Sequence, residues 1–357
     1  MKPVYILAIE TSFDETAAAV LCNDRLISNV VSTQIDVHKE WGGVVPSLAR
    51  REHEKLIGGC IASAFKKSGL KSMSQLSAIA VTYGPGLAPA LEVGVREAKK
   101  LALELNIPII PVNHMEGHAL AGFLRNKHGK RYIDIPDAKF PLLAVCVSGA
   151  HSEIVWAEKF GHYQLLGQTL DDAAGEAFDK VGRMLDLGYP AGAIISELAK
   201  RGNPKAYDIP RPMKNSQDYN FSFSGLKTAC LYQVQTLRKE LGKKFPNIIP
   251  DYCASVQEAI VDSILIKTSR AVKKLNPKMV IFGGGVVSNS RLRVKARAEM
   301  KKLGVPLYFP AKQFCTDNAA MIGYAAYQKF LRGEVLHDVE SLQRDPAVNI
   351  DSRKYCD

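Results

Sequence analysis

The sequence VYILAIETS at Val4–Ser12 decides the fold, because it joins an apolar run to a polar turn, and a second apolar run, AAAVL, follows at Ala17–Leu21. Short apolar runs bounded by turn residues predict strands. Counted from Leu7, the pattern starts again 136 residues later with LAVCVSGA at Leu143–Ala150 and IVWA at Ile154–Ala157. Two similar strand–turn–strand starts suggest two related lobes, and the cleft between two lobes is the usual place for a ligand.

Outward from this start, the first lobe is predicted to begin with an antiparallel meander of three short strands. The three strands cover Val4–Ile9, Ala17–Cys22 and Val30–Gln34, and a helix with one apolar face follows over about Ser47–Lys67. Strands and helices then alternate over Ala78–Tyr83, Pro89–Leu105, Pro108–Val112 and His114–Leu124. A meander followed by such alternation predicts an α/β fold, a mixed sheet flanked by helices.

The second half contains further helices and one clear strand. They are expected at Leu170–Leu187 (a polar turn and a helix), Asp251–Leu275, Met279–Phe282 (the strand), Ser288–Leu303 and Asn318–Leu331. The polar tail Asp338–Asp357 has no clear element.

Composition places the chain among ordinary globular proteins. It has 357 residues, with 47 Lys+Arg against 36 Asp+Glu, a net charge of +11 and a pI near 9.2. Such a surface attracts polyanions, and the densest basic stretch is Arg291–Lys302. From charge alone, solvated helix faces are the favoured interpretation, so nucleic-acid binding is permitted but not established.

The cysteines and the hydropathy of the sequence limit the cellular compartment in which the protein is expected. Seven scattered cysteines without a Cys-x-x-Cys pair exclude a disulfide framework and a four-cysteine zinc site. They suit a reducing compartment, and no apolar run approaches the roughly 18 residues that span a bilayer. The expected location is the cytoplasm.

Three small-residue turns could bind phosphate or nucleotide through backbone N–H groups. They are Thr11-Ser12, the turn Ser148–Ala150 and the glycine run Gly283–Gly285, with Asn289 nearby. Each alone is more simply an ordinary turn, and Asn289 could be a helix N-cap, but three such turns in one chain favour a nucleotide.

His114 and His118 are four residues apart, which places two imidazoles on one helix face at metal-binding spacing. Glu116 lies about 200° round the helix from His114, so it cannot act as the adjacent base of a zinc protease. Asp317 is a candidate third ligand, but spacing alone favours a second interpretation, in which it caps the following helix.

Carboxylates cluster at three further places. Asp14 and Glu15 adjoin the first turn, and two like charges there are costly unless a cation or polarised water is close. Glu176 and Asp179 share a helix face, whereas Asp171-Asp172 is most simply a pair of acids at a helix N-terminus.

At this point the motifs resemble those of the TsaD/Gcp family, the tRNA N6-adenosine threonylcarbamoyltransferases, in order from about residue 4 to residue 333. The matching segments are Ile9–Thr16, Gly42–Pro46, Gly84–Leu87, Asn113–His118, Val147–His151, Asp171–Lys180, Phe221–Lys227 and Thr316–Met321. The His-Met-Glu-Gly-His form is similar to that of the bacterial branch.

The resemblance implies an actin/heat-shock-chaperone/sugar-kinase-like (ASKHA) fold with two RNase H-like lobes. We place the lobes at residues 1–119 with 318–345 and at 120–317, followed by a tail at 346–357. The implied reaction moves the threonylcarbamoyl group from L-threonylcarbamoyl-adenylate to N6 of adenosine 37, in tRNAs that read codons beginning with A, and releases AMP. A TsaB-like paralogue, a TsaE-like ATPase and a TsaC/Sua-type synthase that supplies the adenylate are the implied partners, together with tRNA.

The resemblance also implies site residues. His114, His118 and Asp317 would bind one iron or zinc ion, and Asp14 and Glu15 would be the active-site acids. The adenylate would be held by Cys146, Val147, Ser148, Gly149, Ala150, Asp179, Gly192 and Asn289.

The chain departs from the family pattern in several places, at Phe13 (usually Cys), Ser47 (often Glu), Ala150, Ala191 and Ala193. Phe13 excludes a catalytic thiol, and Ala150 in place of glycine requires a negative φ.

Three other functions are the alternatives to this transferase. They are a sugar-kinase-like phosphotransferase, a metallo-glycopeptidase and a non-catalytic nucleotide-dependent scaffold. Paired histidines argue against the first, and the position of Glu116 argues against the second.

Overall fold

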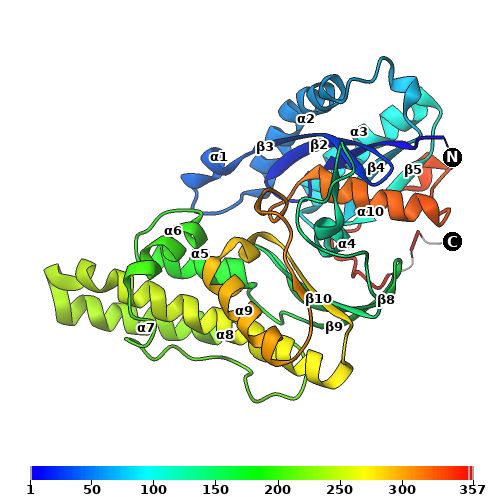
Figure 1. Ribbon diagram of the computed structural model, residues 1–357. Coiled ribbons are helices and arrows are strands. Elements are labelled where there is room, and N and C mark those ends of the chain that lie inside the picture. The colour runs from blue at the N-terminus through cyan, green and yellow to red at the C-terminus, as the bar shows by residue number, and fades with distance from the viewer. Residues whose placement is uncertain (1, 353, 356–357) are drawn as a thin grey trace. The chain divides into compact units, whose positions relative to one another are not determined.

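The computed structural model describes residues 2–352, 354 and 355 (Figure 1). The chain divides into two compact units. Unit 1 comprises Met1–Ala138, Lys159–Gln164 and Pro310–Asp357, and unit 2 comprises Lys139–Glu158 and Leu165–Phe309. The predicted tail at 346–357 includes residues 353, 356 and 357, which lie outside the described residues.

Unit 1 contains a six-stranded mixed sheet in the order β5-β4-β1-β2-β3-β6. Its strands are β1 (Tyr5–Glu10), β2 (Glu15–Cys22), β3 (Arg25–Thr33), β4 (Ala78–Gly84), β5 (Ile109–Asn113) and β6 (Arg125–Asn126). β1, β2 and β3 pair antiparallel, so the predicted meander is confirmed. β4 pairs parallel with both β1 and β5, and the helix α3 makes the crossover from β4 to β5 that a parallel pair needs.

Helices pack on both faces of this sheet (Figure 1). They are α2 (Pro46–Ser68), α3 (Ala88–Leu105), α4 (His114–Leu120) and α10 (Ala319–Leu331), and the short helix α1 (Ile35–Lys39) follows β3 in the chain. Successive strand residues face opposite sides: Leu7 belongs to one hydrophobic cluster with Ile57 of α2, while Gly323 of α10 lies against Ala8 and Leu21 on the other face. A Cβ on Gly323 would be 2.1 Å from Cδ1 of Leu21, so only glycine allows α10 to pack this closely.

The C-terminal segment contributes to the core of unit 1, although its sequence predicts no element. Val339, Leu342 and Val348 are buried in the same cluster as Leu7. Among the residues of this segment that the structure describes, only a short 3₁₀ turn, Val339–Ser341, has regular structure. Burial therefore orders this segment without help from a repeating apolar pattern.

Unit 2 contains a five-stranded sheet in the order β11-β10-β7-β8-β9. The strands are β7 (Leu142–Val147), β8 (Ser152–Lys159), β9 (His162–Gln168), β10 (Met279–Gly283) and β11 (Leu307–Tyr308). β7 and β8 pair antiparallel, with Val145 opposite Ile154. This pairing repeats that of β1 with β2, so the predicted restart of the strand–turn–strand pattern is confirmed.

The helices of unit 2 are α5 (Ala174–Met184), α6 (Ala191–Leu198), α7 (Ser224–Leu241), α8 (Ile249–Leu275) and α9 (Ser290–Lys302). Most residues of α8 are buried, and it packs against α5, α6 and α9. No helix of the described residues is long and apolar enough to cross a membrane.

Candidate metal centre and nucleotide-binding turns

α4 begins where β5 ends and presents its two histidines together. The side chain of Asn113 caps the helix, because its Oδ1 accepts the N–H groups of Met115 and Glu116. His114 and His118 are both buried, and their ring centroids are 4.6 Å apart. The predicted shared helix face is confirmed.

Asp317 lies beside these histidines and does not cap α10. Asn318 is the cap, since its side chain accepts the N–H of Met321. Oδ1 of Asp317 is 3.1 Å from Nε2 of His118 and 3.5 Å from Nε2 of His114. The interpretation of Asp317 as a cap, which spacing favoured, is therefore wrong.

The three side chains fit a metal ion. One donor atom from each of His114, His118 and Asp317 lies within 4.8 Å of the other two. Two imidazole nitrogens and a carboxylate oxygen suit zinc or iron(II). Burial lowers the pKa of His118, which favours the neutral imidazole that binds metal.

Glu116 points into a different environment from the histidines. Its Oε1 accepts a hydrogen bond of 2.9 Å from the hydroxyl of Tyr163. Burial raises the pKa of the Glu116 carboxyl, whereas Lys329 and Arg332 lower it in part. This carboxylate is thus engaged away from the metal-binding atoms, as its helical position predicted.

Asp14 and Glu15 lie at the end of the β1–β2 turn, and a histidine of α2 holds this turn in place. His53 is buried, with its Nε2 3.0 Å from the carbonyl oxygen of Phe13 and its Nδ1 2.7 Å from Oγ1 of Thr16. Burial raises the pKa of Asp14. Burial and the neighbouring Asp14 carboxylate raise the pKa of Glu15 well above its usual range.

The first predicted phosphate turn is not open to a ligand. Thr11 and Ser12 are buried. The N–H of Ser12 donates to Oε1 of Glu10, and the hydroxyl of Thr11 donates to the carbonyl of Ala90. The N–H of Ser12 is thus taken up within the turn and the hydroxyl of Thr11 joins the turn to α3, which agrees with the ordinary turn favoured for each turn alone.

The second predicted turn, Ser148–Ala150, has the required geometry. Gly149 and Ala150 are exposed, and their N–H groups have no hydrogen-bond partner within the part of the chain that the structure describes. Ala150 lies outside the left-handed φ region, so its methyl group is tolerated. The carbonyls of Ser148 and Gly149 accept N–H groups of the first turn of α5, from Gly175 and Glu176.

Two glycines allow other segments to approach this turn closely. A Cβ on Gly284, where φ is +92°, would be 2.3 Å from the carbonyl oxygen of Val147. A Cβ on Gly175 would be 2.6 Å from the carbonyl oxygen of Ser148. Unit 2 thus brings together the end of β7, the glycine run after β10 and the N-terminus of α5, an arrangement able to bind an anion.

The other predicted adenylate residues have varied surroundings. Cys146 and Val147 are fully buried at the end of β7, so neither offers an accessible side chain to a ligand. Asn289 caps α9 through Leu292 and donates to Gln257 over 2.7 Å. These contacts show its predicted capping role, and its ligand role stays a prediction.

Asp179 and Gly192 belong to the packing of α5 with α6. Oδ1 of Asp179 accepts the N–H of Ala191 over 2.7 Å. Ala191 is buried against Gly182, where a Cβ would be 2.0 Å from the Ala191 methyl carbon. The segment before Gly192 is therefore closely packed, despite the departure from the family pattern.

The interpretation of Asp171 as an acid at the N-terminus of the helix that follows it is wrong. The carboxylate of Asp171 accepts hydrogen bonds from the hydroxyls of Ser222 and Ser224 and from the N–H groups of Phe223 and Ser224. It therefore serves the start of α7 and not the helix that follows it in sequence. Its neighbour Asp172 pairs with Lys180 and Lys227.

The basic helix α9 uses much of its charge internally. Arg291 and Lys295 pair with Glu258 of α8 over 2.7 and 2.6 Å. The guanidinium groups of Arg293 and Arg297 lie over the ring of Phe309. Most basic side chains of the stretch Arg291–Lys302 therefore contact other protein groups and are not simply solvated.

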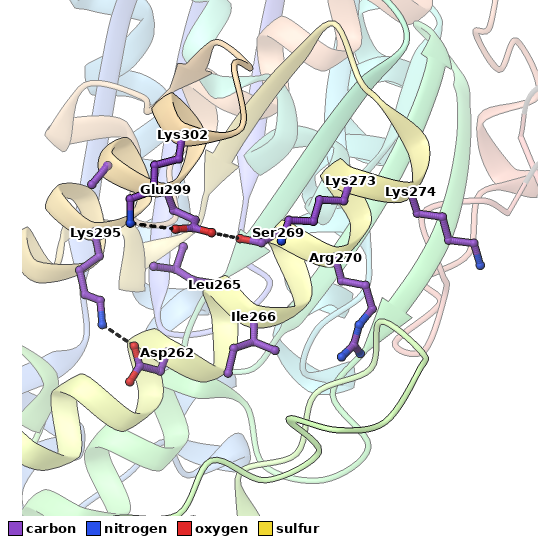
Figure 2. A pocket seen from close by; sticks show the side chains of 11 residues that line it. Asp262, Leu265, Ile266, Ser269, Arg270, Lys273, Lys274, Lys295, Glu299 and Lys302 are labelled. Atoms are coloured by element: carbon purple, nitrogen blue, oxygen red, sulfur yellow. Dashed lines mark hydrogen bonds and ion pairs between the residues drawn. The ribbon is translucent and has the colours of Figure 1, made fainter.

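A groove of about 720 Å³ lies between α8 and α9 (Figure 2). Lys295 points toward Asp262 within it, and Glu299 lies between Ser269 and Lys302. No predicted site residue lines this groove. Its size therefore does not identify the functional site.

The Glu258 pairing predicts a pH-dependent contribution to stability. Burial alone raises the pKa of Glu258, but hydrogen bonds from Arg291 and Lys295 outweigh it and lower the pKa to about 2. Because the folded-state pKa is depressed, the contribution is complete above about pH 5 and declines as the pH falls toward 2. We expect Glu258→Gln to lower the free energy of unfolding by about 2 kcal/mol at pH 7.

Urea unfolding of both proteins between pH 7 and pH 3 measures this contribution. The difference between wild type and variant should shrink as the pH falls below 4.5. A difference that stays constant over that range would show that the ionised carboxylate is not what holds α9 to α8.

Comparisons with known proteins agree with the motifs. A family model described as tRNA N6-adenosine threonylcarbamoyltransferase (TsaD) matches residues 25–324. The chain is 44% identical over 354 residues to a protein of that name from Clostridioides difficile (strain 630), covering 98% of this chain and 99% of the relative. It is 46% identical over 328 residues to the one from Thermosipho africanus, covering 92% and 95%.

Solved structures support the fold. HypF of T. kodakarensis matches with a TM-score of 0.58 at 13% identity, over 93% of this chain and 49% of that one. The ROK hexokinase of Thermus thermophilus matches with a TM-score of 0.50 at 14% identity, over 92% and 99%. At such identities the likeness shows the fold alone, and it confirms the predicted sugar-kinase-like architecture.

Proposed function

Because this chain belongs to the family of tRNA N6-adenosine threonylcarbamoyltransferases, we propose that it transfers a threonylcarbamoyl group to N6 of adenosine 37 in tRNA. The proposed donor is L-threonylcarbamoyl-adenylate, and AMP is the leaving group. The observation that carries the proposal is the convergence of His114, His118 and Asp317 on one metal-binding position.

In this proposal, Nε2 of His114, Nε2 of His118 and a carboxylate oxygen of Asp317 hold one iron or zinc ion. When bound, such an ion supplies Lewis acidity that favours negative charge on a carbonyl oxygen. The surrounding burial supports this role, because charges interact more strongly where water is excluded.

The turn Ser148–Ala150 is proposed to bind the adenylate part of the donor. Gly149 and Ala150 are exposed residues whose N–H groups can donate to phosphate oxygens, and the N-terminus of α5 adds a favourable dipole. Donors held in this way stabilise the negative charge that AMP gains as it leaves.

Asp14 and Glu15 are proposed to orient the acceptor amine and take up its proton. The exocyclic amine of adenosine is a weak base, because its lone pair is delocalised into the purine, so positioning matters more than proton removal. The raised pKa values of the two carboxyls favour a pair that carries one negative charge, leaving one carboxylate able to accept a proton.

Isosteric variants test the acids. We expect Asp14→Asn and Glu15→Gln each to lower the rate of transfer by about 100-fold, the usual contribution of a positioned acid or base, while metal content is unchanged. The assay supplies unmodified tRNA, threonine, bicarbonate, ATP, the adenylate-forming synthase and the TsaB-like and TsaE-like helpers. Nucleoside mass spectrometry then measures threonylcarbamoyl-adenosine.

Glu54→Gln is the matched control, because Glu54 is an exposed carboxylate on α2 that pairs only with Arg50 and Arg96 within the described residues. It should leave transfer unaltered. Wild-type rates in both acid variants would remove Asp14 and Glu15 from the proposed reaction.

A further inference from the structure

Glu10 is a fully buried carboxylate at the end of β1, next to the candidate metal centre. Its Oε2 is 3.0 Å from Nδ1 of His114 and accepts a hydrogen bond of 2.6 Å from the hydroxyl of Thr82. Its Oε1 accepts the N–H of Ser12 over 2.5 Å. Every one of these contacts comes from unit 1, so the arrangement is complete within that unit.

A buried carboxylate is costly to desolvate unless hydrogen-bond donors surround it. Two of the donors, the N–H of Ser12 and the hydroxyl of Thr82, hold the carboxylate in place. The third contact, with His114, is the one that reaches the candidate metal ligands.

This contact determines the protonation pattern of the imidazole. An ionised carboxylate only accepts hydrogen bonds, so the nitrogen that faces it must carry the hydrogen. Nδ1 of His114 is therefore the donor, and Nε2, which lies 3.5 Å from Asp317, keeps its lone pair for a metal ion. Ser12 supports the same state, because its Oγ lies 3.1 Å from Nδ1 and can accept.

His118 has no such support. Its Nδ1 is buried and has no hydrogen-bond partner among the described residues. Of the two histidines, His114 is therefore the one whose Nδ1 is held by a carboxylate.

We propose that Glu10 is a positioning residue that fixes the tautomer and ring orientation of His114 and thereby sets the affinity for the metal ion. This inference rests on the proposed metal centre. It adds a residue that touches neither the metal nor the substrate and acts only through His114.

The isosteric variant Glu10→Gln is the sharpest test. If the Gln amide nitrogen faces His114, it donates to Nδ1 and forces the hydrogen onto Nε2, the metal-binding atom. If it faces Ser12 instead, two N–H groups oppose each other. Either outcome disturbs the site, and partners of this kind contribute about 10–100-fold to metal affinity.

The measurement is zinc affinity of the full chain, by competition with a chromogenic chelator. We expect Glu10→Gln to bind zinc about 10–100-fold more weakly than wild type. Glu116→Gln is the matched control, since it replaces another buried carboxylate of unit 1, on α4, which accepts a hydrogen bond from Tyr163. It should bind zinc with wild-type affinity.

A second readout separates positioning from a general loss of stability. In metal-free wild type, ¹⁵N NMR of the histidine side chains should show hydrogen on Nδ1 of His114, and Glu10→Gln should change this pattern. If Glu10→Gln does not fold, Thr82→Val tests the same arrangement, because it keeps the charge and removes one donor; a severalfold weaker zinc affinity is then expected.

The outcomes are distinct. Wild-type zinc affinity in the folded Glu10→Gln or Thr82→Val variant, or hydrogen on Nε2 of His114 in wild type, would overturn the positioning role while leaving the proposed function intact. Absence of zinc and iron binding in wild type would instead overturn the proposed metal centre, and the inference with it.

Discussion

Replacing His114 by alanine should abolish metal binding and nearly abolish threonylcarbamoyl transfer. The variant removes one of three donor atoms that lie within 4.8 Å of one another, and the two that remain, His118 and Asp317, are too few to hold an ion tightly. Because a bound metal contributes several kcal/mol to charge stabilisation, the rate should fall by about 10²–10³-fold. Elemental analysis of the purified protein and nucleoside mass spectrometry of the tRNA measure the two effects.

His128→Ala is the control for this prediction, because His128 is exposed in unit 1 and is not one of the three grouped residues. It should retain metal and activity. Asp317→Ala should behave like His114→Ala. A metal-free His114→Ala protein that transfers at the wild-type rate would separate the metal from the reaction.

The second large effect is expected at Gly284. Alanine there adopts a left-handed φ of +92° and places its Cβ 2.3 Å from the carbonyl oxygen of Val147. The left-handed conformation and the overlap together should lower the free energy of unfolding by about 3–4 kcal/mol. Relief of the overlap displaces the turn that follows β7, so AMP should bind at least about tenfold more weakly, an energy of about 1.4 kcal/mol.

Gly304→Ala separates the two causes. Gly304 has a φ of +70°, but nothing lies within 4 Å of the position of an added Cβ. This variant should therefore lose only about 1 kcal/mol and keep its affinity for AMP. Chemical denaturation and calorimetric titration with AMP measure both quantities. Equal behaviour of the two variants would show that the contact with Val147 does not shape the nucleotide-binding turn.

Local patterns predicted much of the fold. The alternation of apolar runs and turns gave the meander of β1, β2 and β3 and its counterpart in β7 and β8, because both pairs are formed by neighbours in the sequence. Helical spacing placed His114 and His118 on one face for the same reason.

Features that depend on distant segments could not be predicted in this way. Asp317 meets residues that precede it by about 200 positions, and only the structure shows that Asn318 takes the capping role. Asp171 caps a helix that starts more than 50 residues later. Glu10 looks like an ordinary turn residue until the fold brings His114 to it.

The same limit applies to charge. The number of basic residues in α9 does not indicate that four of them interact with Glu258 or with the ring of Phe309. A sequence reports how many charges a segment carries, whereas the fold decides how many remain available to a polyanion.

Transfer with and without metal tests the central claim most directly. The chain is stripped with a chelator, reloaded with zinc or iron, and supplied with helper proteins, isolated L-threonylcarbamoyl-adenylate and unmodified tRNA. We predict that threonylcarbamoyl-adenosine forms with the reloaded protein, is lost after stripping and returns on reloading. An unchanged rate in the stripped protein, or the absence of the modified nucleoside from every mixture, would contradict the assignment of His114, His118 and Asp317 as the centre of the reaction.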